Sequence, residues 1–343
     1  MKKPLVSVVM PARNAAATIG DSILSLQAQD LSEIEIILVD HGSIDATGKL
    51  MSEAAAKDPR IRVFPCEGTF VEAVNLAWER STADLVARMD SDDVAYPARL
   101  SSQVRFLQDD PDLDACCTQV RIPKRGSETG EIIPADGGYS RYESWVNSVI
   151  TARDISAQRF IDSPIPNPTM MIKRRVLESL GGYHDPPWAE DYDFWLRFLE
   201  EGYRIGKVPL PLLDWYDSPH RSTRTVPRYE QNQFQRAKAH FLSRIESLRL
   251  HGVMIWGAGP IGKQMAGLLN NEGITVHRFI EVNRKKIGNK IGGVEVVDCT
   301  DPGNLPTRPV LLSAVGNSAA RERIRKEIAA IGRVEGEDFF CVA

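Results

Sequence analysis

Short apolar runs alternate with amphipathic stretches along the N-terminal part of the chain. The runs LVSVVM at 5–10 and EIILV at 35–39 have the continuous β-branched pattern of strands buried on both faces. Pro11 is expected to stop the first of them. The same alternation predicts further strands at 61–64 and 84–89, and helices at 18–28, 46–57 and 70–80. Such alternation predicts a mostly parallel sheet with helices on both faces and ligands beyond the carboxyl ends of its strands.

The pattern changes three times further along the chain. Between 122 and 168, glycine and proline interrupt the periodicity and predict an irregular insertion that faces a ligand. Residues 228–250 are predicted to form one amphipathic helix. From about 252, strands and helices alternate again around the turn GAGPIG, which predicts a small Rossmann-like unit. The expected fold class is therefore α/β, with domains at 1–225 and 251–343 joined by a linker helix at 226–250.

Composition narrows the classes of protein that fit this pattern. The chain has 343 residues, 43% of them hydrophobic, which is enough for two cores. Its 42 Lys and Arg against 46 Asp and Glu give a net charge of −4, so no nucleic-acid partner is expected. Five cysteines without CxxC spacing indicate reduced thiols.

No apolar run approaches the ~20 residues of a membrane span, so a cytoplasmic protein is expected. The basic residues at 228–250 suit either a connecting helix or a lipid surface, which leaves open a peripheral contact at the inner face of a membrane. A homo-oligomer is also left open.

Three carboxylates stand within four residues directly after the fourth predicted strand. They belong to the run Asp90, Ser91, Asp92 and Asp93. Like charges this close repel one another, so the cluster needs a cation or full hydration. A hard divalent ion that bridges to a diphosphate would supply that cation. The alternative is an acidic turn that caps the helix expected near Pro97.

Two further acidic positions carry candidate chemistry. Asp40 ends the second predicted strand at the same sheet edge, where it could accept hydrogen bonds from a nucleobase or ribose, or form an Asx turn. Glu190 and Asp191 precede an aromatic helix. They could cap that helix, or Asp191 could serve as a general base for a sugar hydroxyl, which is a weak nucleophile without a proton acceptor.

Four segments together resemble the motifs of glycosyltransferase family 2 with the GT-A fold. They are PARNAAATI, EIILVDHGSIDAT, ARMDSDDVAYPARL and AEDYDFWLRFLEEGYRI, in the family's order and spacing over about residues 4–222. The resemblance implies a hexosyl- or N-acetylhexosaminyltransferase of polysaccharide biosynthesis. It implies a nucleotide-sugar donor, expected to be a UDP-sugar, and a glycan or lipid-linked acceptor. The chain departs from the family at His41, where a second Asp is common, and at 122–168.

The resemblance also implies roles for single residues. Contacts with the nucleotide sugar are implied for Pro11, Ala12, Arg13, Asp40, Asp90, Ser91 and Glu190. Asp191 matches the base of an inverting transfer, in which the acceptor hydroxyl attacks the anomeric carbon opposite the leaving diphosphate. Asp92 and His220 match positions that bind Mn²⁺ or Mg²⁺, although His220 could equally be a solvated loop residue.

The C-terminal turn supports a different hypothesis. Gly257, Gly259 and Gly262 fit the GxGxxG fingerprint, and Glu281 ends the next predicted strand about 20 residues on. The segment resembles small Rossmann-like modules appended to sugar-modifying enzymes, for which NAD binding is uncertain. Two alternatives to a transferase therefore stay open. One is an NAD-dependent oxidoreductase built on this turn, and the other is a non-catalytic sugar-nucleotide-binding protein.

Overall fold

The computed structural model describes residues 3–125, 132–134, 137–217 and 222–343. Its contacts divide the chain into two compact units. The first comprises Met1–Ile155, Pro164–Pro186 and Glu190–Thr225. The second comprises Val226–Ala343 together with two short segments from earlier in the chain, Ser156–Ser163 and Pro187–Ala189.

The first unit is built on an eight-stranded sheet with the order β3-β2-β1-β4-β9-β6-β10-β5. Its strands are β1 (Val6–Ala12), β2 (Ile34–Asp40), β3 (Ile61–Pro65), β4 (Leu85–Arg88), β5 (Val94–Ala95), β6 (Ala115–Arg121), β9 (Met171–Lys173) and β10 (Ile205–Asp214). Strands β3, β2, β1 and β4 are parallel, and β10 is parallel to β6. Strand β9 runs antiparallel to both β4 and β6. The expected α/β class with a mostly parallel sheet is confirmed.

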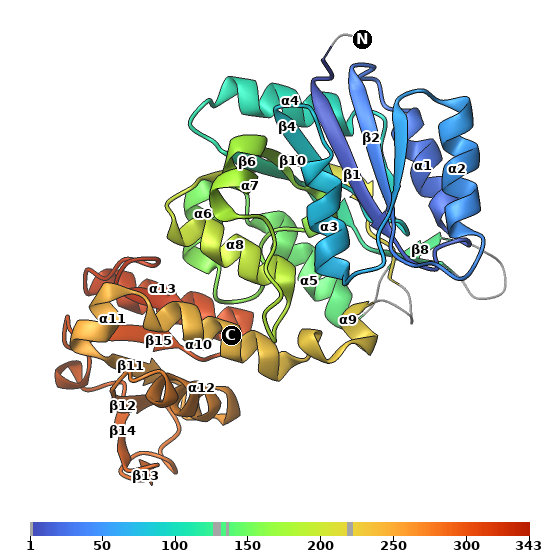
Figure 1. Cartoon of the computed structure of the whole chain (residues 1–343). Helices are drawn as coiled ribbons and strands as arrows, with labels where there is room; N and C mark the ends of the chain where they lie inside the picture. The colour runs from blue at the N-terminus through green and yellow to red at the C-terminus, as the bar shows by residue number, and fades with distance from the viewer. Residues whose placement is uncertain (1–2, 126–131, 135–136, 218–221) are drawn as a thin grey trace. The chain divides into compact units, whose positions relative to one another are not determined.

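Helices cover both faces of this sheet, as Figure 1 shows for α1 and α2 on one side and α3 on the other. One face packs against α1 (Ile19–Gln27), α2 (Thr47–Lys57), α4 (Arg99–Asp109) and α5 (Gly137–Ser148). The other packs against α3 (Phe70–Glu79), α6 (Ala152–Gln158), α7 (Arg174–Leu180) and α8 (Glu190–Glu200). Because β1 and β2 are buried on both faces, their apolar residues lie fully inside, and each buried Val, Ile, Leu or Met contributes about 1.5–3 kcal/mol.

Local sequence signals set the ends of two helices that flank the sheet. Helix α3 begins with a capping box, in which the Thr69 hydroxyl accepts from Glu72 N and the Glu72 carboxylate accepts from Thr69 N. Helix α7 ends at Gly181, whose φ of 67° is a left-handed conformation that favours glycine.

Two sequence predictions about this unit were wrong. Strand β1 continues through Pro11 and Ala12, because β4 pairs with β1 only as far as Val9. Beyond that point Pro11 has a strand on one side alone, so its missing N–H costs no bond. Within the described part of 122–168 lie the helices α5 and α6, the antiparallel strands β7 (Pro123–Arg125) and β8 (Ile132–Pro134), and the turn η1 (Asn167–Thr169). Gly137 and Gly138 form the start of α5 and do not interrupt the chain's regular structure.

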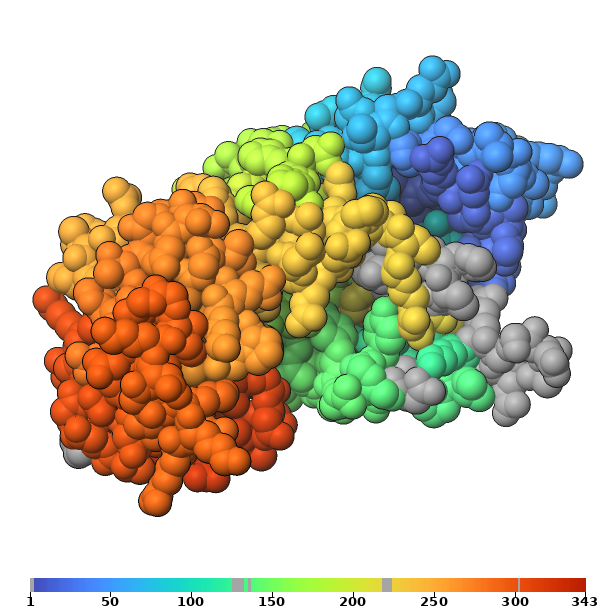
Figure 2. Space-filling model, turned by 90° about the horizontal axis from the view of Figure 1, so that it is seen from below, coloured from blue at the N-terminus to red at the C-terminus, as the bar shows by residue number. Residues whose placement is uncertain are grey.

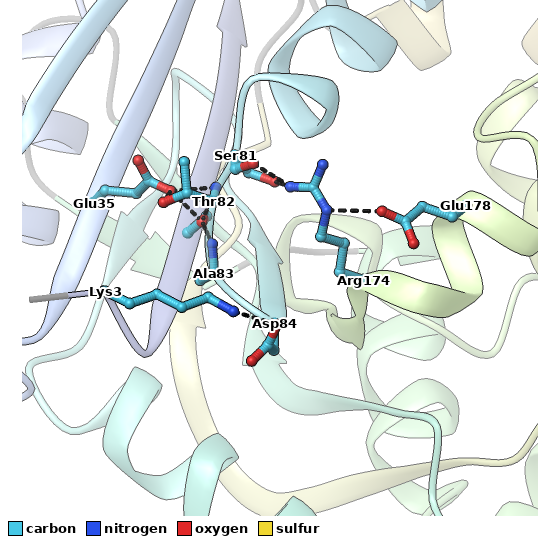
Figure 3. A network of polar contacts seen from close by, with 9 residues as sticks. Lys3, Glu35, Ser81, Thr82, Ala83, Asp84, Arg174 and Glu178 are labelled. Carbon is cyan, nitrogen blue, oxygen red and sulfur yellow. Dashed lines mark hydrogen bonds and ion pairs between the residues drawn. The ribbon is translucent and has the colours of Figure 1, made fainter.

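A polar network joins the amino ends of the sheet strands, at the edge opposite the predicted site (Figure 3). The buried carboxylate of Glu35 accepts from Ser7 Oγ at 2.6 Å, from Thr82 N at 2.6 Å and from Thr82 Oγ1 at 2.7 Å. Its second oxygen lies 2.9 Å from Arg62 Nη1. Burial acts to raise the pKa of Glu35, but these hydrogen bonds outweigh it and the pKa is lowered.

The second unit is built on a six-stranded sheet with the order β13-β14-β12-β11-β15-β16. Its strands are β11 (Val253–Trp256), β12 (Val276–Glu281), β13 (Lys290–Ile291), β14 (Val294–Asp298), β15 (Val310–Ser313) and β16 (Phe339–Cys341). All neighbouring pairs are parallel except β13 with β14. Helices α12 (Pro260–Asn271) and α13 (Ser318–Ala330) accompany them. In Figure 2 these C-terminal residues, orange to red, form one continuous body.

The helix predicted at 228–250 is divided. The chain forms α9 (Ser222–Thr225), η2 (Pro227–Tyr229), α10 (Gln231–Ser243) and α11 (Glu246–His251). The break falls at Ile245, whose backbone is extended, and Leu248 on the following helix is buried. Lys238 of α10 points inward and donates to Ile161 O at 2.8 Å and Val342 O at 3.1 Å, so this cation does not belong to an exposed basic face.

Among the residues that the structure describes, no helix combines the length and the apolar character needed to cross a membrane.

Candidate active site

A buried arginine stands at the carboxyl end of β4. Arg88 is 2% exposed, and its Nε and Nη2 donate to Asp90 Oδ1 at 3.0 and 2.9 Å. Its guanidinium also lies over the rings of Phe70 and Tyr183, 5.4 and 6.0 Å from their centroids. Burial acts to lower the pKa of Arg88, but the charges of Asp90 and Glu190 and the Tyr183 hydroxyl raise it overall. Arg88 therefore stays charged in a nearly dry position.

The carboxylates of the acidic run are not equivalent. Asp93 is fully buried, and its Oδ1 accepts from Tyr216 N at 3.0 Å. This oxygen ties the loop after β4 to the segment after β10, so Asp93 has a structural role. Asp90 is bound to Arg88, and Ser91 and Asp92 are part-exposed in the turn between β4 and β5. Asp90 and Asp92 are thus the carboxylates of the run that remain near solvent.

The start of α8 brings two more carboxylates to the same region. Glu190 is 3% exposed, whereas Asp191 is half-buried and accepts from Tyr192 N at 2.7 Å. Burial and the charge of Glu190 raise the pKa of Asp191 to about 7, against the lowering effects of the Tyr192 N–H and Arg88. Because Asp90 also contributes to this rise, the ends of β4 and α8 share one electrostatic site.

The ends of β1 and β2 hold the remaining N-terminal candidates. Pro11 and Ala12 are buried in β1, and Arg13 follows them exposed. Asp40 ends β2, opposite Ala12 in the sheet register, and its Oδ1 accepts from Ser43 N at 3.0 Å. A Cβ at Gly48 would lie 2.4 Å from Asp40 Oδ2, so any larger residue there would displace this carboxylate from its present position.

His41 occupies the position where the family commonly has a second Asp. It is 8% exposed, its ring lies 6.5 Å from Phe70, and its Nδ1 has no hydrogen-bond partner among the described residues. Burial and the charge of Arg13 lower the pKa of His41, so the imidazole is neutral at pH 7.

Side chains tie together the two loops that follow β1 and β2. Ser43 Oγ accepts from Asn14 N at 3.0 Å, and Asn14 Oδ1 accepts from Ile44 N at 3.0 Å. Thr47 Oγ1 accepts from Ala15 N at 2.7 Å. Asn14 adopts a positive φ of 50° in this arrangement. The wall beside Asp40 is therefore fixed before any ligand binds.

The carboxylates of Asp90 and Asp92 are suitable ligands for a divalent ion, although they do not form a complete binding site by themselves. Among the described residues, no three His, Cys, Asp or Glu side chains converge on one point. Mg²⁺ in phosphate-transfer sites is usually held by one or two carboxylates plus the phosphates of the substrate. Asp90 and Asp92 supply such hard oxygen ligands. His220, the other expected metal ligand, lies outside the described residues.

The glycine-rich turn of the second unit has the shape expected for binding a dinucleotide, but the carboxylate of Glu281 beside it is already hydrogen-bonded within the protein. A Cβ at Gly262 would lie 1.9 Å from Gly257 O, whereas one at Gly259 would meet nothing within 4 Å. Glu281 Oε1 accepts from Val282 N and Asn283 N, at 2.9 and 3.1 Å.

The second oxygen of Glu281 is occupied too. Oε2 accepts from Ala258 N at 3.3 Å and from Lys286 Nζ at 3.0 Å. These bonds use the roughly four acceptor sites of a carboxylate, which leaves none for a ribose hydroxyl. Glu281 therefore does not fit the role that NAD binding would give it.

Sequence reasoning did not select Arg88, Tyr183 or Asn167. Asn167 Oδ1 accepts from Tyr183 OH at 3.3 Å and from Trp195 Nε1 at 3.2 Å, which supports the ring against Arg88. One signal was present in the sequence, because an arginine inside the apolar strand at 84–89 needs buried partners. Asn167 and Tyr183 gave none, since only the fold brings them together.

Comparisons with known proteins agree on one family. The family model described as Glycosyl transferase family 2 matches residues 7–181. An uncharacterised glycosyltransferase of Haemophilus influenzae is 30% identical over 234 residues, 67% of this chain and 70% of that protein. The O-antigen biosynthesis glycosyltransferase WbnJ of Escherichia coli is 29% identical over 57% of this chain and 72% of its own length. TarS 1–349 of S. aureus, solved in complex with UDP-GlcNAc, has a TM-score of 0.52 at 17% identity, covering 78% of this chain and 80% of that one. This last likeness shows the fold alone.

Proposed function

This chain belongs to glycosyl transferase family 2 and is a glycosyltransferase, and from that premise we propose that it is an inverting enzyme that uses a UDP-sugar. The acceptor we propose is a hydroxyl of a glycan or of a lipid-linked precursor. The observation that carries the proposal is the group of Asp90, Glu190 and Asp191 around Arg88, at the carboxyl ends of the sheet strands. The UDP-GlcNAc bound by TarS and the O-antigen role in the name of WbnJ support the donor and acceptor classes.

Asp191 is the proposed general base. A base works best when its pKa is near the working pH, and the pKa of Asp191 is raised to about 7. In the reaction the acceptor hydroxyl gives its proton to Asp191, and its oxygen forms a bond to the anomeric carbon. The bond from that carbon to the diphosphate breaks, and the electron pair leaves with the nucleoside diphosphate. Attack opposite the leaving group inverts the anomeric configuration.

The proposed donor site lies beside the ends of β1 and β2. Asp40 keeps Oδ2 beside Gly48, where it can accept from the base or ribose, while Oδ1 is used by Ser43 N. Pro11 and Ala12 form the buried floor next to it, and Arg13 can reach the phosphates. Ser91 and Glu190 complete the proposed contacts on the sugar side.

Asp92, with Asp90 beside it, is the proposed carboxylate for Mn²⁺ or Mg²⁺, and His220 is a further candidate ligand. A bound ion would neutralise the charge that develops on the leaving diphosphate. Arg88 holds Asp90 in place through its paired hydrogen bonds, so one ligand is oriented before an ion arrives.

Thermal-shift measurements with UDP-, GDP-, dTDP- and CMP-sugars, each with and without Mn²⁺, test this proposal. A ligand that binds the native state raises the melting temperature, by an amount equivalent to about 2.7 kcal/mol at a hundredfold excess over Kd. We expect Mn²⁺-dependent stabilisation by a UDP-sugar that Asp92→Asn loses. Asp112→Asn, an exposed carboxylate after α4, is the matched control and should keep it.

Three results would contradict parts of the proposal. Stabilisation by NAD(H) alone would move the function to the second unit, against the occupied Glu281. Binding of a UDP-sugar with no release of UDP under any condition would indicate a non-catalytic binding protein. Retention of the anomeric configuration in the product, seen by NMR, would exclude Asp191 as the base of a single displacement.

A further inference from the structure

Helix α5 carries three aromatic side chains along one side. Tyr139, Tyr142 and Trp145 follow one another at intervals of three residues, the spacing that brings side chains together on the surface of a helix. The ring of Trp215, which follows β10, lies edge-on to that of Tyr142 with centroids 6.0 Å apart, and the rings of Tyr142 and Trp145 are 5.8 Å apart. These four side chains are referred to below as the aromatic platform.

The aromatic platform differs from the aromatic core of the same unit. All four of its rings pack in part against the core, and all four remain half-exposed. The rings of Phe194, Trp195 and Phe198 on α8, in contrast, are at most 1% exposed. Rings that serve only the core are buried in this way, because every exposed part of a ring forgoes the gain from burial. The platform thus leaves apolar surface in contact with solvent.

Hydrogen bonds fix α5, and with it three rings of the platform, against β6. Within the described residues, β9 pairs with the first two residues of β6 alone. Further along β6, Asn147 Oδ1 accepts from Val120 N at 2.9 Å and Asn147 Nδ2 donates to Val120 O at 2.7 Å. Glu143 Oε2 accepts from Ile122 N at 2.7 Å. Two side chains of α5 thus satisfy backbone groups of β6 as a neighbouring strand would, and the rings are held in position before a ligand binds.

The platform is joined to the proposed metal-binding loop by backbone contacts. Trp215 N donates to Arg121 O at 2.8 Å, at the carboxyl end of β6. The N–H of the next residue, Tyr216, donates to Asp93 Oδ1 at 3.0 Å. Asp93 directly follows Asp92, the carboxylate proposed for the cation. Trp215 therefore begins the platform at the sheet edge where the transfer is proposed to occur.

The groups beside the platform suit a sugar better than a lipid chain. A pyranose ring has C–H groups on its faces and hydroxyls around its rim, so it needs a flat apolar surface and hydrogen-bonding groups together. Arg224 lies 5.0 Å from the centroid of the Tyr139 ring, and Asp217 accepts two hydrogen bonds from this guanidinium at 2.8 Å. A hydrocarbon chain would gain nothing from this ion pair and would remove it from water at a cost.

We propose that the aromatic platform binds a sugar ring of the acceptor, so that the accepting group is a saccharide, free or lipid-linked, and not a lipid without a sugar. The inference rests on the proposed function, because it names the acceptor of that transfer. The C–H face of the sugar lies on the rings of the platform, and Arg224 donates to a hydroxyl at the rim of the sugar.

The test titrates the full chain, in the presence of UDP, with the methyl β-glycosides of glucose, galactose, mannose and N-acetylglucosamine, and follows binding by saturation-transfer NMR. We expect a glycoside of this panel to bind, with the strongest transfer to the C–H protons of one ring face. Trp215→Ala should weaken that binding roughly 10-fold, because the sugar loses a stacking contact and the area it buries on an indole ring. Trp215→Phe keeps a ring and should restore most of the affinity. The Kd for UDP should be the same in both variants as in wild type.

Two further variants separate sugar binding from a general loss of stability. Phe64 of β3 is also a half-exposed aromatic residue of this unit, with Arg62 and Arg80 each 5.2 Å from its ring centroid. Phe64→Ala removes a ring outside the platform and should keep glycoside binding. Should Trp215→Ala not fold, Tyr142→Ala removes the ring that contacts both tryptophans and should weaken binding in the same way.

Three results would overturn the proposal. A wild-type chain that binds UDP but no glycoside of the panel has no such sugar site. Equal glycoside affinities in Trp215→Ala, Tyr142→Ala and wild type would place the sugar elsewhere. Tighter binding of decyl phosphate, a lipid phosphate without a sugar, that Trp215→Ala loses would identify the platform as a lipid site.

A failure of the proposed function would look different. The wild-type chain would then bind no UDP-sugar and release no UDP, whatever its affinity for the glycosides.

Discussion

The two units place acidic side chains at the same point of similar sheets, yet the surroundings of those acids differ. Glu281 ends β12 of the second unit, and four hydrogen bonds from three backbone N–H groups and Lys286 occupy its carboxylate. In the first unit, the buried guanidinium of Arg88 forms an ion pair with Asp90 and also interacts electrostatically with Glu190 and Asp191. The carboxylate of Glu281 is neutralised within its own turn region, whereas the acids of the first unit lie close enough to raise the pKa of Asp191.

The directions of the pKa shifts express this difference. The pKa of Glu281 is lowered, because its hydrogen bonds and Lys286 outweigh the effect of burial. The pKa of Asp191 is raised to about 7 by burial and by the charge of Glu190. A carboxylate with a lowered pKa has its partners within the protein, whereas one with a raised pKa is ready to take a proton or a cation. Glu35, at the amino edge of the first sheet, belongs with Glu281 in this respect.

The largest effect should be a loss of kcat on removing Asp191, the proposed proton acceptor. Asp191→Asn keeps the shape of the side chain but cannot accept the proton, so we expect kcat for transfer or UDP release to fall about 100- to 10,000-fold. Donor affinity should stay within a few-fold, measured by UDP titration. Glu200→Gln at the other end of α8 is the control and should leave kcat unchanged. Near-normal turnover in Asp191→Asn would show that another group takes the proton.

The strands and helices around the first three strands could be predicted from the sequence, because continuous β-branched runs and helical periodicity are local signals. Strand β9 is where the prediction became incomplete. It lies antiparallel between β4 and β6, far from both in sequence, and no local pattern gives that pairing. Helix α5 was missed because it begins with Gly137 and Gly138, which favour a break, and α6 was missed because its 7 residues are too few for a periodic pattern.

For the candidate site, too, the sequence predicted some features and not others. The positions of Asp40, Asp90 and Asp191 could be derived from strand ends and from the family resemblance. The partner of Asp90 could not, since Arg88 acts through burial and through rings that come from α3 and from the segment before α8. The occupied state of Glu281 was equally hidden, because Lys286 reaches it only once the turn after β12 has formed.

The next largest effect should be a loss of stability on removing Glu35, a carboxylate whose hydrogen bonds all come from the protein itself. Glu35→Ala removes the acceptor of Ser7, Thr82 and Arg62 and leaves buried donors without partners, so we expect a loss of about 3 kcal/mol in the free energy of unfolding, measured with urea at pH 7. Glu53→Ala, which breaks an exposed pair with Lys49, is the control and should cost less than about 0.5 kcal/mol.

The pH dependence of this loss has a definite sign. Because the folded pKa of Glu35 is lowered from its ordinary value of 4.5, its contribution is complete above pH 4.5 and declines as the pH falls through the folded pKa. The difference between Glu35→Ala and wild type should therefore shrink in acid. If the stability difference between Glu35→Ala and wild type grew below pH 4.5, the folded pKa of Glu35 would be raised, as that of Asp191 is, and not lowered.

A smaller effect should come from relieving the crowding around Asp191. Glu190→Gln removes a charge that raises the pKa of Asp191, so the acidic limb of the kcat profile should move to lower pH. At pH 6 the variant should then retain a larger share of its maximal rate than wild type does, by a few-fold. Its plateau should be slightly lower, because a weaker base transfers protons less effectively. An unmoved limb in a pH series at saturating donor would disconnect Glu190 from the titration of Asp191.

The smallest effect should be a loss of stability on changing Glu281, the fully hydrogen-bonded carboxylate of the second unit. Glu281→Gln keeps an oxygen for part of the turn but loses the charged pair with Lys286, so we expect a loss of about 1 kcal/mol in the free energy of unfolding. Turnover and UDP affinity should be unchanged, because the partners described for Glu281, which are Ala258 N, two backbone N–H groups of its own turn and Lys286, all belong to the second unit. The opposite outcome, normal stability together with a changed affinity for NAD(H) or a nucleotide, would show that this carboxylate exchanges its internal partners for a ligand. Glu281 and the acids near Arg88 would then both be ligand-binding groups, and they would differ only in the ligand that each binds.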